Sequence, residues 1–333
     1  MNASTRLTDI PELKACVDYL MYRYTDDGRP AAEMSISQML ASQPTWDADS
    51  MLRGLERLCQ VASTRRMLYD VYPQGQGDKR DAKLFFLPAE HQPSDKPFVI
   101  CVSGGGYSCV CSAVESFPVG ARLNALGYNV FALNYRVGEG VTLPAPVEDL
   151  AAAVKLILAN PSEFGLVNTD YVVNGYSAGG SLVTIYGTER NGWAKYGCPR
   201  PIALFPIYPA ISTAPEFISD PQARLHFMGR MFGPGFDEAY ARSFDVPDCM
   251  TDSYPPCYLV HAKDDPAVPV AHSLTLERLL QERGIPVRAE IIEKGGHGWG
   301  DGSGTTAEGW VDRAAAFLEG LQHMCSQAGI YRL

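Results

Sequence analysis

One serine in this chain stands in a setting that suits a nucleophile. Residues 175–180 read GYSAGG and match the pattern G-x-S-x-G, in which glycines permit a tight strand-to-helix turn and the serine hydroxyl stays exposed. The pattern alone is weak, but an apolar run at 171–174 leads into it and a helical run at 181–186 follows it. We therefore predict that Ser177 is the nucleophile of an acyl-transfer reaction. The alternative is a glycine-rich turn without a chemical role.

Three consecutive glycines at 104–106, in the run SGGGY, form a second candidate feature. They directly follow an apolar strand-like run at 98–102. Acyl transfer passes through a tetrahedral oxyanion that needs backbone N–H donors, and residues without side chains let the backbone approach a substrate. We predict that the amides of Gly105, Gly106 and Ala178 form this oxyanion hole. A phosphate-binding loop is excluded because the G-x-G-x-x-G spacing and a following Lys-Ser/Thr are missing, whereas a plain flexible turn stays open.

A serine hydroxyl needs an adjacent imidazole to accept its proton at neutral pH. His297 lies in the glycine-lined run KGGHGWG at 294–300, after the last strand-like run and before a C-terminal helix, so we predict that it is the general base. His261 lies within a strand-like run and is predicted to be a core residue. The remaining histidines are given structural roles: His91, His226, His272 and His323.

A carboxylate should orient the imidazole from a loop after the preceding strand. Two neighbouring aspartates, Asp264 and Asp265, follow the strand-like run at 257–261. We favour Asp265, because it precedes Pro266 in a D-P-x-V-P string in which proline stiffens the turn. Asp264 is the competing candidate, with loop capping as its other role. The order serine, aspartate, histidine is the one expected when the nucleophile lies on a G-x-S-x-G turn.

The elements that must position these residues alternate between strand and helix from about residue 66 onward. Eight runs read as strands: 67–72, 82–87, 98–102, 129–134, 171–175, 202–207, 257–261 and 287–292. Helical runs lie between the later ones: 118–126, 147–158, 181–189, 271–283 and 305–323. The central strands are almost continuously apolar, as strands buried on both faces of a parallel sheet are. We predict a mostly parallel sheet with helices on both faces and an antiparallel opening pair, whose two strands are joined by a short turn at 75–77.

Residues 1–65 have a different, helical pattern, with a helix predicted after Asp9, a turn at 28–30 and a second helix carrying Met51, Leu55 and Leu58 on one face. We divide the chain into this helical N-terminal extension and a catalytic domain at 66–333. An insertion at about 210–252 is rich in large apolar residues, and it could cap the site, pack on the domain as amphipathic helices, or do both. The N-terminal helices could extend the cap, form an oligomer contact or pack on the domain.

The composition is that of an ordinary globular protein, with 46% hydrophobic and 20% charged residues. The net charge of −10 argues against nucleic acid or an anionic membrane as a partner. No apolar run approaches the ~20 residues that span a bilayer, and the N-terminus does not read as a secretory signal. The nine cysteines are scattered, which fits reduced thiols in a cytoplasmic protein. No metal site or cofactor is expected.

At these residues the chain resembles the bacterial esterase family of the α/β hydrolases that includes acetyl xylan esterases and other carbohydrate and feruloyl esterases. The resemblance extends from about residue 96 to 322 and rests on the runs at 103–107, 133–136 (LNYR), 146–150 (PVEDL), 175–180, 264–269 and 294–298. It implies an α/β-hydrolase fold with an eight-stranded sheet, a Ser177–His297–Asp265 triad and deacylation of small esters. Relatives often have histidine or proline where this chain has Ser103, and the N-terminal extension is not part of the family's core.

The function favoured by the sequence is hydrolysis of carboxylic esters of small acyl groups, acetyl first, with carbohydrate esters as candidate substrates and an acyl-enzyme as intermediate. The expected partner is a small-molecule ester, and a homo-oligomer stays open. One alternative is a peptidase of the prolyl oligopeptidase type, which usually has a long β-rich domain ahead of the hydrolase domain. The other is a non-catalytic binding protein, which commonly lacks a triad residue.

Overall fold

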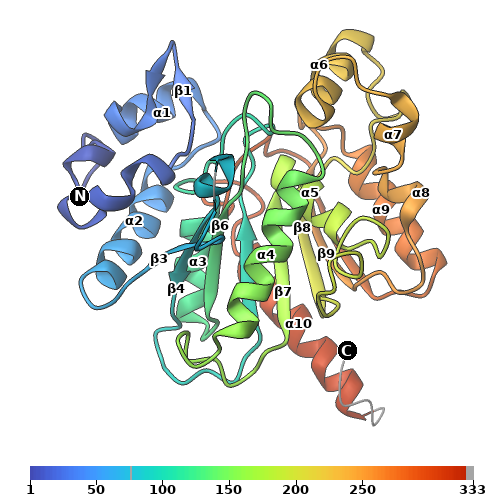
Figure 1. Ribbon diagram of the computed structural model, residues 1–333. Helices are drawn as coiled ribbons and strands as arrows, with labels where there is room; N and C mark the ends of the chain where they lie inside the picture. The colour runs from blue at the N-terminus through green and yellow to red at the C-terminus, as the bar shows by residue number, and fades with distance from the viewer. Residues whose placement is uncertain (76, 328–333) are drawn as a thin grey trace.

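An eight-stranded sheet forms the centre of the computed structural model, which describes residues 1–75 and 77–327 (Figure 1). Its strand order is β10-β9-β8-β7-β5-β6-β4-β3. Strand β4 pairs antiparallel with β3 and β6, and the other neighbours are parallel. The mostly parallel sheet with an antiparallel opening pair is therefore confirmed. The strands are β3 (Leu68–Asp70), β4 (Lys83–Leu87), β5 (Phe98–Val102), β6 (Val130–Asn134), β7 (Tyr171–Tyr176), β8 (Ala203–Ile207), β9 (Cys257–Ala262) and β10 (Val287–Ile292).

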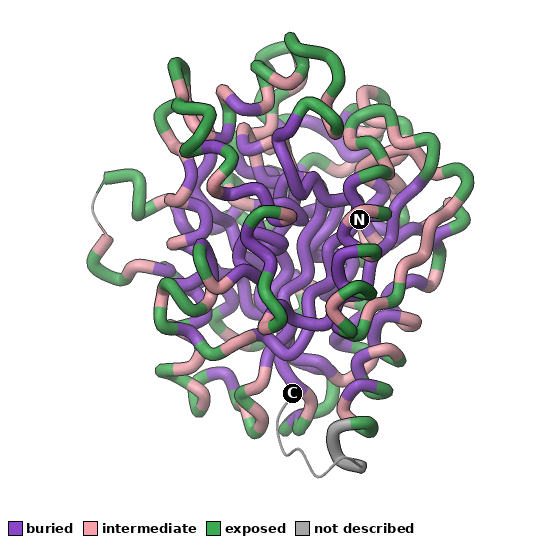
Figure 2. The backbone as a smooth tube through the Cα atoms, turned by 90° about the vertical axis from the view of Figure 1, so that its right-hand side faces the viewer, coloured by how far each residue is buried: buried purple, intermediate pink, exposed green. Residues whose placement is uncertain are grey.

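Helices cover both faces of the sheet and divide the apolar core into two clusters. One cluster joins α2 (Ala48–Ala62), α3 (Ser116–Ala125) and α10 (Trp310–Gln327), and the other joins α4 (Ala145–Ala159), α5 (Ala178–Tyr186) and α9 (Ala271–Glu282). Figure 2 shows the buried residues concentrated on the central strands, with exposed residues in the surrounding loops. Strands β5 to β9 are buried at every position, which explains why their sequences are apolar without alternation.

Helix α10 begins at Trp310, five residues later than the sequence pattern predicts. Residues 305–309 form turns instead, because Gly309 adopts a positive φ value that an α-helix does not allow. A short 3₁₀ helix, η4 (Gly77–Asp81), also lies between β3 and β4, where the sequence indicated only a turn. Gln76, within that predicted turn, lies outside the described residues.

The N-terminal extension contains less α-helix than its sequence pattern predicts. After the short 3₁₀ turn η1 (Leu7–Asp9), the first long element is a 3₁₀ helix, η2 (Pro11–Tyr19). Leu13 and Cys16 of η2 are buried, as is Ile10 immediately before it. Their three-residue spacing matches the 3₁₀ turn. The predicted turn is a small hairpin, β1 (Thr25–Asp26) and β2 (Arg29–Pro30), whose loop residues both have positive φ. The short η3 (Ala31–Glu33) follows, and α1 (Ile36–Ser42) begins with a capping box.

The insertion after β8 folds into three short helices, α6 (Pro221–Phe232), α7 (Glu238–Arg242) and α8 (Val246–Cys249). Figure 1 shows α6 and α7 on the opposite side of the molecule from the N-terminal extension. Apolar residues on these helices, including Met228 and Met231, are buried. The helices therefore pack onto the domain, which is one of the two arrangements expected from the sequence. Among the described residues, none of the helices has the length and apolar character needed to cross a bilayer.

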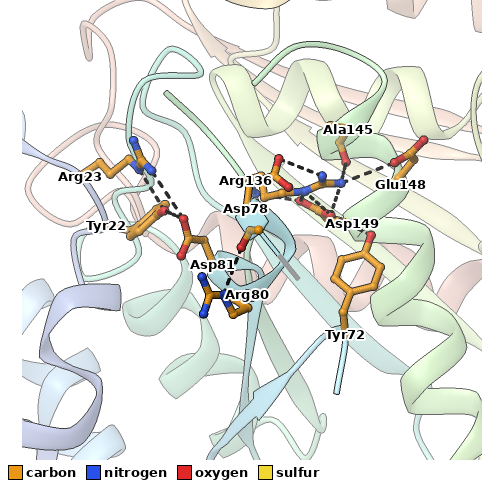
Figure 3. Close-up of polar contacts among 11 residues, drawn as sticks. Tyr22, Arg23, Tyr72, Asp78, Arg80, Asp81, Arg136, Ala145, Glu148 and Asp149 are labelled. Atoms are coloured by element: carbon orange, nitrogen blue, oxygen red, sulfur yellow. Dashed lines mark hydrogen bonds and ion pairs between the residues drawn. The ribbon is translucent and has the colours of Figure 1, made fainter. Parts of the chain in front are cut away.

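A buried ion pair joins the end of β6 to α4 (Figure 3). The backbone N–H of Arg136 donates to Asp149 at 2.8 Å, and its Nε donates to the same carboxylate at 2.9 Å. The hydroxyl of Tyr72 donates to Asp149 at 2.8 Å. Because each buried charge has several partners, the pair can fix the course of the chain between β6 and α4 without leaving a charge unsatisfied. The runs LNYR and PVEDL thus have a structural role here.

Candidate active site

Ser177 occupies a strained turn between β7 and α5. Its φ of 52° and ψ of −120° are unusual for a residue with a side chain. A Cβ on Gly175 would lie 2.4 Å from the carbonyl oxygen of Gly179, and a Cβ on Gly179 would lie 2.1 Å from that of Val102. Both positions therefore require glycine, which accounts for the G-x-S-x-G pattern. The turn holds the Ser177 side chain at the carboxyl end of the central strand.

The structure brings His297 to Ser177 across 120 residues of sequence. The imidazole Nε2 lies 2.8 Å from Ser177 Oγ, within the range of a hydrogen bond. Its Nδ1 lies 2.7 Å from Asp265 Oδ2. Because the carboxylate can only accept at Nδ1, the neutral imidazole presents a lone pair at Nε2, where it can take the serine proton.

The two aspartates after β9 have different partners. Asp265 has a fully buried side chain, and its Oδ1 accepts from the amides of Ala267 and Val268 at 2.8 Å each. Asp264 is exposed and accepts from the amides of Gly295 and Gly296 at 2.9 Å each. Asp265 thus contacts the imidazole, whereas Asp264 holds the turn that carries His297.

His261 lies behind Asp265, on strand β9. Its Nε2 lies 3.2 Å from Asp265 Oδ2 and 2.9 Å from the carbonyl oxygen of Val268, and its Nδ1 lies 2.7 Å from Ser273 Oγ. Both partners of Nε2 are acceptors, so this nitrogen carries the proton. Burial opposes ionisation of Asp265, but the hydrogen bonds from His261 and His297 outweigh it and hold the pKa of this carboxyl well below its usual range. Asp265 is therefore a carboxylate throughout the neutral range.

The triple glycine passes directly over Ser177. A Cβ on Gly104 would lie 2.8 Å from Ser177 Cβ, and Gly105 and Gly106 have φ values of 136° and 61°. Within the described part of the chain, no hydrogen bond uses the amides of Gly105, Gly106 or Ala178. These three N–H groups therefore have no acceptor within the described residues, whereas the amide of Gly104 donates to Glu115.

A pocket of about 840 Å³ opens beside this glycine loop. Its walls come from four segments, at 23–25, 107–108, 138–142 and 229–234, so both the N-terminal hairpin and α6 contribute. Arg230 of α6 reaches the loop, since a Cβ on Gly106 would lie 2.8 Å from its guanidinium. The volume lies within the range of small-molecule sites.

Known proteins resemble the chain over its central and C-terminal parts. The family model BD-FAE matches residues 85–195. An acetylxylan esterase of Xylanibacter ruminicola is 27% identical over 229 residues, which cover 68% of this chain and 45% of the relative. An endo-1,4-beta-xylanase B of Butyrivibrio fibrisolvens is 26% identical and is covered over 34% of its length. The chain thus spans less than half of these two curated relatives.

Solved structures agree with this relationship. An acetyl ester-xyloside bifunctional hydrolase from Caldicellulosiruptor lactoaceticus is 26% identical, with a TM-score of 0.60 over 75% of this chain and 89% of that one. A sugar hydrolase from Lactococcus lactis is 29% identical, with a TM-score of 0.59 over 72% of this chain and 93% of that one. The chain has the α/β-hydrolase fold and is similar to bacterial esterases of that fold. The resemblance inferred from the sequence motifs is therefore confirmed.

Three contacts at the candidate site were not foreseen from the sequence. Thr45, in the N-terminal extension, donates from its hydroxyl to the carbonyl oxygen of His297 at 2.6 Å. Glu115 is buried under the glycine loop and accepts from the Gly104 amide. Neither residue lies in a motif, and a lone threonine or glutamate gives no sequence signal of its partner. His261 was assigned to the core, and its contact with Asp265 was missed for the same reason.

Proposed function

We propose that this α/β hydrolase cleaves carboxylic esters through an acyl-enzyme on Ser177. The observation that carries the proposal is the continuous chain of contacts from Ser177 Oγ to His297 and on to Asp265, at 2.8 and 2.7 Å. Those distances and the free N–H groups at Gly105, Gly106 and Ala178 suit an acyl-transfer site. The esterases among its relatives support the same reaction.

In the proposed mechanism, His297 takes the Ser177 proton as the oxygen attacks the ester carbonyl. The resulting oxyanion accepts hydrogen bonds from the glycine-loop and Ala178 amides, and the Asp265 carboxylate stabilises the imidazolium. The imidazolium then protonates the leaving alkoxide as the ester C–O bond breaks, which leaves an acyl-Ser177. A water molecule, deprotonated by His297, attacks the acyl carbon and releases the carboxylic acid and free Ser177.

A short acyl group is the proposed substrate, with acetyl as the leading candidate. The space beside α5 is filled by apolar side chains of the insertion, including Phe227, Met231 and Phe244, and only about 10 Å³ remains. We propose that the acyl group lies in this space, so a long acyl chain would require these residues to move. The larger pocket beside the glycine loop is the proposed place for the alcohol part, and its volume suits a sugar. Acetylated carbohydrates are the proposed alcohol class because the relatives include an acetylxylan esterase.

The test is hydrolysis of p-nitrophenyl acetate, butyrate and octanoate, followed by acetate release from acetylated xylo-oligosaccharides. The proposal expects kcat/KM to be highest for acetate and to fall with chain length. A protein that turns over none of these esters would contradict the proposed reaction. A preference for octanoate would contradict the short acyl group and leave the ester chemistry in place.

A further inference from the structure

Glu115 is a buried carboxyl group that the proposed reaction does not use. It lies immediately before α3 and is 4% exposed. Among the residues that the structure describes, none of the ion pairs involves it. A buried carboxyl without a cation is costly for the folded state, so its position needs an explanation in terms of its neighbours.

The two oxygens of Glu115 connect the two loops of the candidate site. Oε2 accepts from the amide of Gly104 at 2.5 Å, in the loop that passes over Ser177. Oε1 accepts from the hydroxyl of Tyr208 at 3.1 Å, and the same hydroxyl accepts from the amide of Gly300 at 3.2 Å. Gly300 belongs to the loop that carries His297. One carboxyl group thus links the glycine loop to the histidine loop through a single tyrosine.

Tyr208 also lies against the imidazole itself. Its ring centroid is 4.8 Å from that of His297, and Tyr208 is fully buried with a φ of 39°. Positive φ at a bulky residue is strained, so the surroundings must hold the ring in this place. Gly300 packs closely as well, since a Cβ there would lie 2.2 Å from the carbonyl oxygen of Val114. The histidine loop therefore rests on the segment that contains Glu115.

We propose that Glu115 is a positioning residue for ester hydrolysis, which acts as a carboxylate to hold the glycine loop over Ser177 and to stabilise the imidazolium of His297. This inference rests on the proposed function. Gly104 connects it to the oxyanion donors, and Tyr208 connects it to the base. Among the described residues, no cation forms an ion pair with Glu115. Its negative charge can therefore offset the positive charge that forms on His297 during the reaction.

Electrostatics agree with this role. Burial raises the pKa of Glu115 to about 7, while the Gly104 amide, the charge of His297 and the Tyr208 hydroxyl act in the opposite direction. Glu115 is thus ionised above about pH 7. Other titratable groups influenced by the carboxylate are weak acids that stay neutral there, namely Cys111, Tyr135, Tyr176 and Tyr208. The carboxylate also influences Cys109, but the pKa of this thiol is lowered, because it forms a hydrogen bond with Cys111.

The variant Glu115→Gln separates positioning from a merely structural role. The amide oxygen can accept from Gly104 and the amide nitrogen can donate to Tyr208, so the fold should tolerate it. We expect kcat for p-nitrophenyl acetate to fall about 10- to 100-fold with little change in KM, because even a small misplacement of the reacting groups slows the reaction. The acid limb of the kcat/KM profile should move to lower pH, because the imidazolium loses a negative neighbour.

Thermal unfolding supplies the second readout. A carboxyl whose pKa is raised by folding favours the folded state below its unfolded pKa, and this contribution is lost as pH rises through about 7. At pH 8, Glu115→Gln should therefore have the same Tm as the unmodified protein or a higher one. Tyr208→Phe removes the connecting hydroxyl and should shift the acid limb in the same direction. Glu319→Gln, at an exposed position of α10, is the matched control for loss of one charge.

Unchanged kcat and an unmoved acid limb in Glu115→Gln would overturn the inference. A fall of kcat and Tm together, with the acid limb unmoved, would also overturn it, because that is the result of a structural role. The unmodified enzyme measured alongside keeps the two proposals apart. If it fails to hydrolyse p-nitrophenyl acetate, the ester chemistry is contradicted, whereas a failure confined to the variants concerns Glu115 alone.

Discussion

At the scale of single residues, the candidate site depends on which aspartate contacts the imidazole of His297. Asp264 and Asp265 are neighbours in sequence and the same in charge, yet they face different groups. Asp265 lies 2.7 Å from His297 Nδ1, whereas Asp264 accepts from two backbone amides of the histidine loop. A reaction that requires a fixed tautomer of His297 therefore depends far more on Asp265 than on Asp264.

Substitution of each aspartate by asparagine tests this assignment. Asp265→Asn replaces an acceptor with an amide that can present a donor to Nδ1, which favours the wrong tautomer, and should lower kcat by about 10⁴-fold. Asp264→Asn keeps one acceptor oxygen for the loop amides and should have a much smaller effect. Steady-state kinetics on p-nitrophenyl acetate measure both variants. The opposite ranking would move the orienting acid to Asp264.

The pH dependence of kcat/KM follows from the same contacts. His297 must be neutral to accept the serine proton, so activity should fall about tenfold per pH unit below the titration of the imidazole. Asp265 adds no second loss in that range, because its depressed pKa keeps it ionised until much lower pH. A pH–rate profile with slope one on the acid side is expected for Glu115→Gln, whereas the unmodified protein should have a steeper acid side, because Glu115 also takes up a proton at about pH 7. A slope of two in Glu115→Gln would show that another essential group protonates together with the base.

At the scale of elements, the strands were readily predicted from sequence because strands that are buried on both faces have continuously apolar sequences. Strands β5 and β10 have the predicted limits, and β6 to β9 begin or end within one residue of them. The N-terminal extension was less predictable. Its apolar spacing suits both α- and 3₁₀ helices over a short stretch, and contacts with the rest of the chain decide between them.

The N-terminal extension also supports the loop that carries His297. The Thr45 hydroxyl donates to the carbonyl oxygen of that residue, and Thr45 and Trp46 lie against Gly296 and Gly298. The backbone carbonyls of Leu20 and Tyr22 accept from Ala113 and Val110, in the segment after the glycine loop. An element outside the α/β core therefore contacts both loops of the candidate site.

Thr45→Val tests this support with a side chain of the same shape. A typical net hydrogen bond contributes about 1 kcal/mol, which corresponds to a rate change of about fivefold if it serves only to place the imidazole. We expect kcat to fall by about this factor while Tm changes little. Thr64→Val, on the exposed end of α2, serves as the control. Equal kinetics for both variants would show that the extension does not influence the base.

At the scale of the whole molecule, the fold assembles groups that are far apart in the chain at one edge of the sheet. The three predicted triad residues could be found from sequence because each lies in a short loop with its own glycine or proline signal. Glu115, His261 and Thr45 could not, because each is an ordinary residue whose partner is set only when β9, the glycine loop and the N-terminal extension come together. The pocket proposed for the substrate likewise combines four separate segments.

The most direct test of the central claim is covalent labelling by a fluorophosphonate, located by intact-mass measurement and peptide mapping. If the imidazole of His297 activates Ser177, one equivalent of reagent should attach, and the modified peptide should contain Ser177. Ser177→Ala should neither be labelled nor hydrolyse p-nitrophenyl acetate, while Ser63→Ala, exposed at the end of α2, should behave like the unmodified protein. Labelling at another serine, or turnover that persists in Ser177→Ala, would contradict the account.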